Sequence, residues 1–152
     1  MRLKGLNCIV TGGSSGIGAA TVKRFVDEGA QVLIADIDID TANSFAEEMG
    51  SSVSAIKCDV RIESDVKAVS DHAYETWGKV DVLVNNAGSE LNQTYDKTTL
   101  EEWDRVLDTD LKGPWLMCKY IVPGMVDAGS GSVINISSLN GLVGFPLSTA
   151  YG

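Results

Sequence analysis

The sequence predicts an α/β fold: a doubly wound parallel sheet covered by helices on both faces, in three α/β/α layers. Short runs rich in Val, Ile and Leu recur along the chain, and segments with helical periodicity separate them. The apolar residues of these runs are adjacent rather than alternating, as in "CIV", "VLI" and "VLV", which is typical of parallel strands buried on both faces. The alternation of strands with helices favours a parallel sheet. The 152 residues suit a single domain.

Five strands are expected, over residues 6–11, 31–36, 53–58, 80–85 and 132–137. The last of them would lie at the edge of the sheet and carry Val133, Ile134 and Ile136, although proteins normally cover such an edge. A complete doubly wound sheet of this type has at least about six strands. We therefore expect residues 1–152 to form a domain that is incomplete on its C-terminal side.

Four helices are expected, over residues 16–28, 41–49, 62–77 and about 99–126. Asp38 or Asp40 is a suitable N-terminal cap for the second. The fourth contains a Gly-Pro pair at 113–114 and a Pro-Gly pair at 123–124, which are expected to kink or fray it.

Acidic residues outnumber basic ones, with 21 Asp and Glu against 12 Lys and Arg and a net charge of −9. Because the basic residues are scattered, nucleic acid and anionic membranes are not expected as partners. No apolar run approaches the ~20 residues that span a bilayer. The three cysteines lie far apart, and the single histidine has no second ligand nearby, so we expect no metal site and a reduced, cytoplasmic setting.

The first candidate site is "TGGSSGIG", residues 11–18, between the first strand and the first helix. Gly12, Gly16 and Gly18 would let the backbone turn tightly and approach a pyrophosphate, while the amides and dipole of the helix N-terminus favour the anion. Glycines at this spacing also occur in simple tight turns. However, the second strand ends in Asp36, where a carboxylate accepts hydrogen bonds from the ribose of an adenosine. Together the two features predict a dinucleotide site.

Asp36 also bears on the choice of cofactor, because NADP carries a phosphate on the 2′ oxygen of this ribose. At ~4 Å and an effective dielectric of ~20, the repulsion between Asp36 and each phosphate charge would be about 4 kcal/mol. No Arg or Lys follows Asp36 directly, and Ser14 and Ser15 in the glycine turn are uncharged. The sequence therefore favours NAD.

Polar residues follow each of the remaining strands. "CDV", residues 58–60, ends the third strand, where Asp59 is either an acceptor for an adenine amino group or a simple helix cap. "NNAG", residues 85–88, ends the fourth, where side-chain amides can brace neighbouring loops and small residues allow a cofactor to approach. Ser138 follows the fifth strand, and Tyr151 lies thirteen residues further on. Open α/β sheets bind their ligands at this carboxyl edge.

These motifs, in this order, resemble those of the short-chain dehydrogenases/reductases, oxidoreductases with a Rossmann-like fold that bind NAD(P). "TGGSSGIG" is similar to the family's cofactor turn, "CDV" to its adenine-contacting motif and "NNAG" to its sheet-bracing motif. Ser138 and Tyr151 resemble its catalytic serine and tyrosine. The resemblance implies that Tyr151 exchanges a proton with a substrate oxygen, which Ser138 binds, while hydride moves at the nicotinamide. The implied substrate is a secondary alcohol or its ketone.

Two positions depart from the family pattern. The family places a lysine four residues after the tyrosine, at position 155, and this sequence ends at Gly152. We therefore expect a piece of a longer enzyme, with a truncated, catalytically silent NAD-binding module as the alternative. In "LDTDLKG", Asp110 stands where the family usually has an asparagine that supports a proton path, so Asp110 is a possible third catalytic residue or an ordinary helix-face acid.

The resemblance also implies a homodimer or homotetramer for the full-length protein, and the apolar face of the segment from Trp115 to Met125 is the expected interface. The residues expected to contact the cofactor are Gly12, Ser14, Ser15, Gly16, Ile17, Gly18, Asp36, Ile37, Asp59, Val60, Asn86, Ala87 and Gly88.

Overall fold

The computed structural model describes residues 1–151, and the predicted alternation of strands and helices is confirmed. The strands are β1 (Asn7–Thr11), β2 (Gln31–Asp36), β3 (Val53–Lys57), β4 (Val82–Asn85) and β5 (Ser132–Asn135). The helices are α1 (Gly16–Asp27), α2 (Ile39–Met49), α3 (Glu63–Trp77), α4 (Leu100–Leu107) and α5 (Gly113–Asp127), with a π-helical segment (Asp108–Lys112) and a 3₁₀ turn (Leu139–Gly141).

The five strands form one parallel sheet in the order β3-β2-β1-β4-β5. The central strand β1 pairs with β2 on one side and β4 on the other, with Ile9 opposite Leu33 and Leu83. The chain therefore winds outward from β1 to β3 and then returns to start again at β4. Doubly wound sheets bind ligands where the strand order reverses, which in this sheet lies between the carboxyl ends of β1 and β4.

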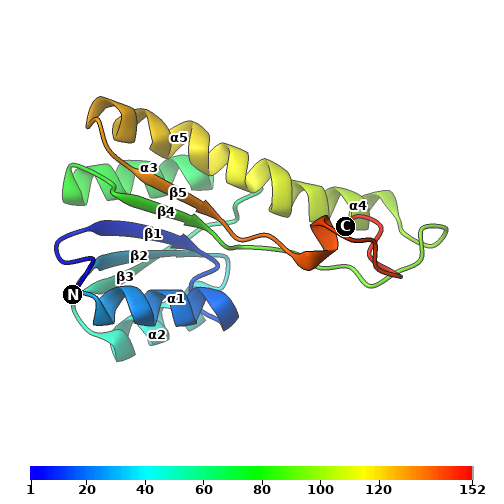
Figure 1. Ribbon diagram of the computed structural model, residues 1–152, viewed down its shortest axis with the longest axis horizontal. Helices are drawn as coiled ribbons and strands as arrows, with labels where there is room; N and C mark the ends of the chain where they lie inside the picture. Colours follow the sequence, from blue (N-terminus) through cyan, green and yellow to red (C-terminus); the bar gives the residue numbers. More distant parts are fainter. Residues whose placement is uncertain (152) are drawn as a thin grey trace.

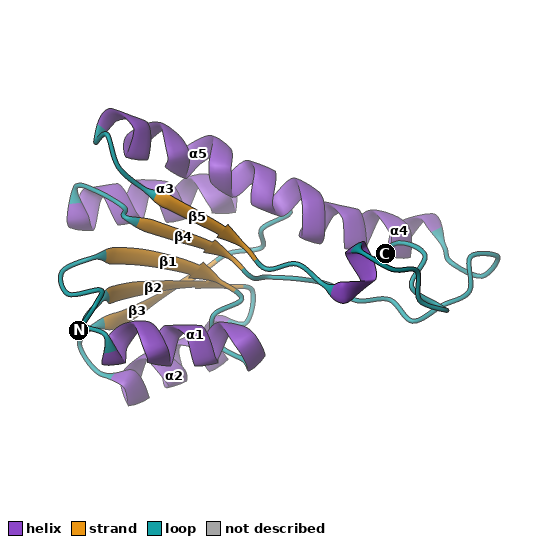
Figure 2. Cartoon of the chain, viewed as in Figure 1, coloured by secondary structure: helices purple, strands orange, loops and turns teal. Residues whose placement is uncertain are grey.

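Helices cover both faces of the sheet, as the sequence predicts. α1 and α2 lie on one face and α3 and α5 on the other (Figures 1 and 2). Two core clusters correspond to these layers. The cluster under α3 and α5 includes Ile9, Leu33, Val66, Leu83 and Ile121, and the cluster under α1 and α2 includes Val10, Val22, Ile34, Ala42 and Val84.

The long helix expected over residues 99–126 is confirmed as a continuous helical stretch from Leu100 to Asp127, but its hydrogen bonding changes in the middle. α4 ends at Leu107, the π-helical segment follows, and α5 begins at Gly113. Contacts distant in sequence accompany the π-helical segment: Asp110 accepts a hydrogen bond from the Ser89 amide, and Gly113 lies so close to Val60 that a Cβ there would be 2.8 Å from Cγ2. π-helical turns are often found at functional sites.

The second expected interruption, at Pro123, does not occur, because α5 continues to Asp127. Two side chains of α3 bond to backbone carbonyls just before the proline. Ser70 Oγ donates to the carbonyl of Tyr120 at 3.0 Å, and Tyr74 Oη donates to that of Ile121 at 2.6 Å. These two bonds tie α5 to α3 next to the proline, although the carbonyl that lacks its helical donor because of Pro123 is that of Lys119.

Tyr74 fits against α5 only because residue 124 is glycine. A Cβ at Gly124 would lie 2.3 Å from Tyr74 Oη and 2.4 Å from Cζ. We expect Gly124→Ala to displace the ring, to break its bond to Ile121 and to lower the free energy of unfolding by about 2 kcal/mol. Urea denaturation measures this. Gly144→Ala is the control, because a Cβ at Gly144 meets nothing within 4 Å, and equal stability of the two variants would contradict the prediction.

The interface expected on α5 needs correction. Leu116, Met117, Ile121 and Met125 are buried in the core against the sheet rather than exposed. Of the apolar residues in this region, Trp115 is 58% exposed, and Leu111 and Val126 are also exposed. Apolar periodicity alone did not distinguish a helix face that covers the sheet from one that meets another subunit.

β5 is an edge strand of the sheet, as the sequence predicts. β5 pairs with β4, and its residues Val133 and Ile134, with Ile136 just beyond, are partly exposed. Within residues 1–151, no helix combines the length and apolar character needed to cross a membrane.

Candidate active site

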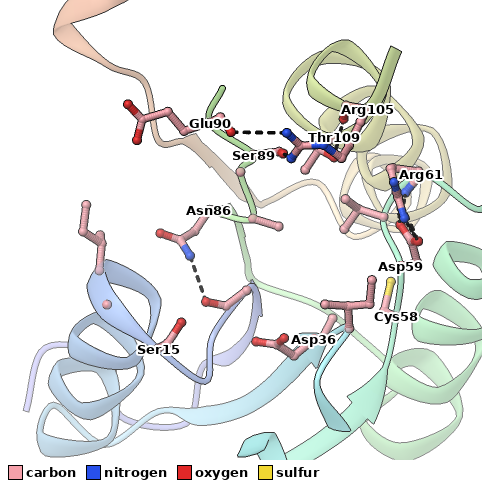
Figure 3. A pocket seen from close by; sticks show the side chains of 18 of the residues that line it. Ser15, Asp36, Cys58, Asp59, Arg61, Asn86, Ser89, Glu90, Arg105 and Thr109 are labelled. Carbon is pink, nitrogen blue, oxygen red and sulfur yellow. Dashed lines mark hydrogen bonds and ion pairs between the residues drawn. The ribbon is translucent and has the colours of Figure 1, made fainter. Parts of the chain in front are cut away.

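Two adjoining clefts lie along the carboxyl edge of the sheet, with volumes of about 590 Å³ and 500 Å³. The first extends from the ends of β2 and β3, past the glycine turn, to α4 (Figure 3). The second lies between the ends of β4 and β5 and the π-helical segment. The residues that line both are Ile17, Asn86, Ala87, Gly88 and Tyr151.

The glycine turn forms the floor of the first cleft. Gly12 and Gly16 have positive φ angles of 61° and 52°, which side-chain-bearing residues rarely adopt. Gly18 does not line the cleft, because it packs inward: a Cβ there would lie 2.1 Å from the carbonyl oxygen of Gly12. Ser15, the N-cap of α1, makes no side-chain capping bond among the residues described. The first amides of α1 are therefore free to face an anion.

Hydrogen bonds between the loops after β1 and β4 hold this turn. Thr11 Oγ accepts from the amides of Asn86 and Ala87, each at 3.0 Å. In return, Asn86 Nδ2 donates to the carbonyls of Thr11 and Gly12, also at 3.0 Å. Figure 3 shows Asn86 between the glycine turn and the upper wall of the cleft. The bracing suggested by "NNAG" is thus made by Asn86, which fixes the two sides of the cleft relative to each other.

Asp36 is buried at the end of β2 and is held by the backbone around it. Its Oδ2 accepts from the amide of Ser14 at 3.0 Å and from Ser14 Oγ at 2.7 Å, and its Oδ1 accepts from the amide of Asp38 at 3.1 Å. Ser14 itself does not line either cleft. Ser14 orients Asp36 in this structure, and its contact with a cofactor stays a prediction.

Asp59 and Val60 follow β3 and also line the first cleft. Asp59 does not cap α3, which begins at Glu63 with Ile62 as its N-cap. Instead the Asp59 carboxylate forms an ion pair with Arg61, with 2.6 Å between Oδ2 and Nη2. Of the two sequence-based interpretations of Asp59, the simple helix cap is wrong.

The second cleft brings together the three candidate catalytic residues, Ser138, Tyr151 and Asp110. Ser138 lies just after β5, where its Oγ accepts from the amide of Asn140 at 3.2 Å. Tyr151 reaches the clefts from the C-terminal segment, which is joined to the loop after β4 by a bond from the Gln93 amide to the Leu147 carbonyl at 2.9 Å.

Asp110 holds the backbone beside both clefts. Its Oδ1 accepts from the Ser89 amide at 2.7 Å, while its Oδ2 is buried and has no hydrogen-bond partner within residues 1–151. Burial raises the pKa of Asp110 above its ordinary value, and the bond from Ser89 and the charge of Arg105 only partly oppose this. The charged carboxylate is thus less stable in the folded chain than in the unfolded one.

This predicts a pH-dependent effect of Asp110→Asn. Because the folded pKa is raised, ionisation of Asp110 destabilises the fold as pH rises from the unfolded value of about 3.9 through the folded one. Asparagine keeps the acceptor for Ser89 and removes the charge, so we expect the free energy of unfolding to increase by about 1 kcal/mol near pH 7. The gain should shrink near pH 4. Urea denaturation at both pH values measures it, and a gain independent of pH would contradict the assignment.

Several residues of the first cleft were missed by sequence reasoning: Arg61, Ser89, Arg105 and Thr109. Arg105 donates to Ser89 Oγ and, at 3.4 Å, to the carbonyl of Glu90, while Thr109 Oγ donates to the carbonyl of Arg105 at 2.7 Å. Arg61 had a signal, since it lies two residues after a candidate site carboxylate. Arg105 and Thr109 had none, because only the folded chain brings α4 and the π-helical segment to the loop after β4.

The first cleft fits a dinucleotide. It offers a helix N-terminus for a pyrophosphate, an anchored carboxylate at the end of the next strand for a ribose, and the open space beside Gly16, where a Cβ would meet nothing within 4 Å. Comparison with known proteins agrees with this geometry: the family described as "short chain dehydrogenase" matches residues 7–152.

The chain belongs to the short-chain dehydrogenase family.

Its similarity to individual short-chain dehydrogenases covers nearly the whole chain. Momilactone A synthase of Oryza sativa subsp. japonica is 40% identical, over 99% of this chain and 56% of its own length. The 3-oxoacyl-(acyl-carrier-protein) reductase of Thermotoga maritima is 36% identical, over 99% of this chain and 63% of its own length. The chain thus spans little more than half of these curated relatives.

A solved structure shows the same fold. The crystal structure of a metagenomic short-chain oxidoreductase in complex with NADP superposes with a TM-score of 0.94 and 32% identity, over 99% of this chain and 70% of that one. The doubly wound, Rossmann-like nucleotide-binding fold expected from the sequence is therefore confirmed.

Proposed function

We propose that the protein is an NAD-dependent oxidoreductase that interconverts a secondary alcohol and a ketone by hydride transfer. The observation that carries this proposal is that Tyr151 lines both clefts, the one suited to a dinucleotide and the one that contains Ser138. A proton-exchanging group is required where the cofactor and the substrate meet.

Each residue has a separate role in this reaction. Bound NAD would accept the hydride that leaves the alcohol carbon. Tyr151 takes the proton from the alcohol oxygen, or returns it in the reverse direction, and Ser138 orients that oxygen by a hydrogen bond. Asp110 acts indirectly, because its bond to the Ser89 amide fixes the backbone beside both clefts.

NAD is the proposed cofactor because Asp36 is buried, anchored by three hydrogen bonds and unable to turn away from a 2′-phosphate. The cleft does contain cations, but the guanidinium of Arg61 is already paired with Asp59. The related metagenomic oxidoreductase binds NADP, so this preference needs its own test.

We expect the full-length protein to bind NADH about 100-fold more tightly than NADPH, which corresponds to about 2.7 kcal/mol. This is less than the repulsion of about 4 kcal/mol between Asp36 and each phosphate charge, because solvent in the open cleft screens part of that repulsion. Asp36→Asn should reduce this ratio to below about tenfold, mainly by improving NADPH binding. Fluorescence titration with both nucleotides measures the ratio. A wild-type ratio near one would contradict the preference for NAD.

The reaction is tested by incubating the full-length protein with NAD and a panel of aliphatic, cyclic and aromatic secondary alcohols, and by following the ultraviolet absorbance of NADH. NADH formation with at least one alcohol, and ketone reduction in reverse, supports the proposal. Tight NADH binding without turnover of any alcohol or ketone would instead support a catalytically silent NAD-binding module.

The exposed apolar residues Leu111, Trp115 and Val126 support a second part of the proposal, that the full-length protein is a homodimer or homotetramer.

A further inference from the structure

Ser89, in the loop after β4, is held by two side chains of the helical stretch that follows it. Asp110 Oδ1 accepts a hydrogen bond from the Ser89 amide at 2.7 Å, and Arg105 Nη1 donates to Ser89 Oγ. The second terminal nitrogen of the guanidinium, Nη2, donates to the carbonyl of Glu90 at 3.4 Å. Both the backbone and the side chain of Ser89 are therefore fixed, and Arg105 binds the loop at two consecutive residues.

The π-helical segment explains how two residues five positions apart reach the same serine. In a regular α-helix, such residues point about 140° apart around the helix axis. A π-helical turn is wider, because its hydrogen bonds join residues five apart, as the bond from the Gly113 amide to the Asp108 carbonyl does here. We infer that the wider turn brings Arg105 and Asp110 toward one side of the helix, where both meet Ser89.

The chain segment just before Ser89 lines both clefts. Residues 86–88 belong to the walls of both, and Ser89 and Arg105 line the first. A Cβ at Gly88 would lie 3.6 Å from Asp110 Oδ1, so the Asp110 carboxylate lies against this segment as well. Figure 3 shows Arg105 beside Ser89 in the upper wall of the cleft. A shift of Ser89 would therefore move the wall where the two clefts meet.

Arg105 binds neutral acceptors rather than a carboxylate. None of the ion pairs within residues 1–151 includes it, and its two bonds to the loop go to a hydroxyl and a carbonyl oxygen. A half-buried guanidinium of this kind either fixes the geometry of its acceptors or binds an anionic group of a ligand. The fork of two nitrogens on neighbouring residues favours the first role, because the planar group orients both acceptors at once.

We propose that Arg105 is a positioning residue for the reaction: together with Asp110 it holds Ser89, and so fixes the backbone of residues 87–88 where cofactor and substrate meet. This inference rests on the proposed function. A misplacement of about 1 Å can lower the rate of a reaction by roughly 10²-fold even when no reacting group is lost. Loss of Arg105 should therefore lower kcat and leave the affinity for the dinucleotide unchanged.

The test compares Arg105→Met, Ser89→Ala and the double variant of the full-length protein by steady-state kinetics and NADH titration. Each single variant should lower kcat by about tenfold, with KM and the Kd for NADH within about threefold of the wild type. Because both variants remove the same bond, the double variant should lose about tenfold as well, rather than the roughly 100-fold of independent sites. Arg24→Met is the control, since Arg24 is 63% exposed and lines neither cleft.

Hydrogen exchange gives a second measurement that does not depend on turnover. The Ser89 amide donates to Asp110, and it should exchange at least about fivefold faster in Arg105→Met than in the wild type, because the loop loses its second attachment. The exchange rate should be unchanged in Arg24→Met. If Arg105→Met does not fold, Ser89→Ala, which removes a single hydroxyl, tests the same bond by both measurements.

Three results would overturn the inference. The first is a wild-type kcat in Arg105→Met or in Ser89→Ala. The second is a 100-fold loss of kcat in the double variant, since Arg105 would then not act through Ser89. The third is NADH binding at least tenfold weaker in Arg105→Met, since Arg105 would then bind an anionic group of the dinucleotide directly. A folded wild type without turnover would instead overturn the proposed function, and this role with it.

Discussion

Replacing Tyr151 by phenylalanine is expected to lower kcat by about 10³-fold, because general acid–base catalysis contributes roughly 10²–10⁴-fold and phenylalanine has no proton to exchange. The ring would still fill its place between the two clefts, which both include Tyr151 in their walls. The Kd for NADH should therefore change by less than about threefold, since no binding group for the dinucleotide is lost. Steady-state kinetics and NADH titration of the same preparation measure the two quantities.

Tyr95→Phe is the matched control. Tyr95 is 80% exposed and lines neither cleft, so this variant loses a tyrosine hydroxyl without affecting the site. Its kcat should equal that of the wild type. If Tyr151→Phe retained more than about a tenth of the wild-type kcat, a group other than Tyr151 would have to be the catalytic acid–base.

Gly18→Ala is expected to abolish measurable NADH binding and to lower the free energy of unfolding by about 3 kcal/mol, the upper end for an overpacked core position. The added Cβ would lie 2.1 Å from the carbonyl oxygen of Gly12 and 2.6 Å from Asn86 Nδ2. Neither the Gly12 carbonyl nor the Asn86 amide can move away on its own, because Asn86 Nδ2 donates a hydrogen bond to that same carbonyl. Relief requires α1 to move away from the turn, which would misplace its N-terminal amides.

Gly144→Ala is again the control, because a Cβ at Gly144 meets open space. Urea denaturation and NADH titration should show wild-type values for it. Wild-type NADH affinity in Gly18→Ala would mean that the glycine turn does not form the pyrophosphate site.

The parts of the fold that the sequence predicts correctly depend on local signals. Continuous apolar runs place β1 to β5 within a few residues, although the strand expected at 80–85 begins at Val82 and the one expected at 132–137 ends at Asn135. The π-helical segment inside the long fourth helix was not predicted, for a non-local reason: it accompanies contacts of Asp110 with Ser89 and of Gly113 with Val60. Periodicity along one helix contains no information about such partners.

In the candidate site, too, the sequence predicts where the residues lie but not which side chains they contact. The motif residues gather at one edge because parallel strands bring their carboxyl ends together. The finer roles depend on side-chain contacts: Ser14 orients Asp36, Gly18 packs under Gly12, and Asp59 forms an ion pair with Arg61. The spacing of these residues in the sequence is compatible with several such arrangements.

The most direct test of the central claim is calorimetric titration of the full-length protein with NADH. We predict one site per chain, with a Kd on the order of 10 μM, in the range common for enzyme ligands. The heat of binding should disappear in Gly18→Ala and persist in Tyr151→Phe. A folded wild-type protein that binds neither NADH nor NADPH at millimolar concentration would contradict the claim that this cleft is a dinucleotide site.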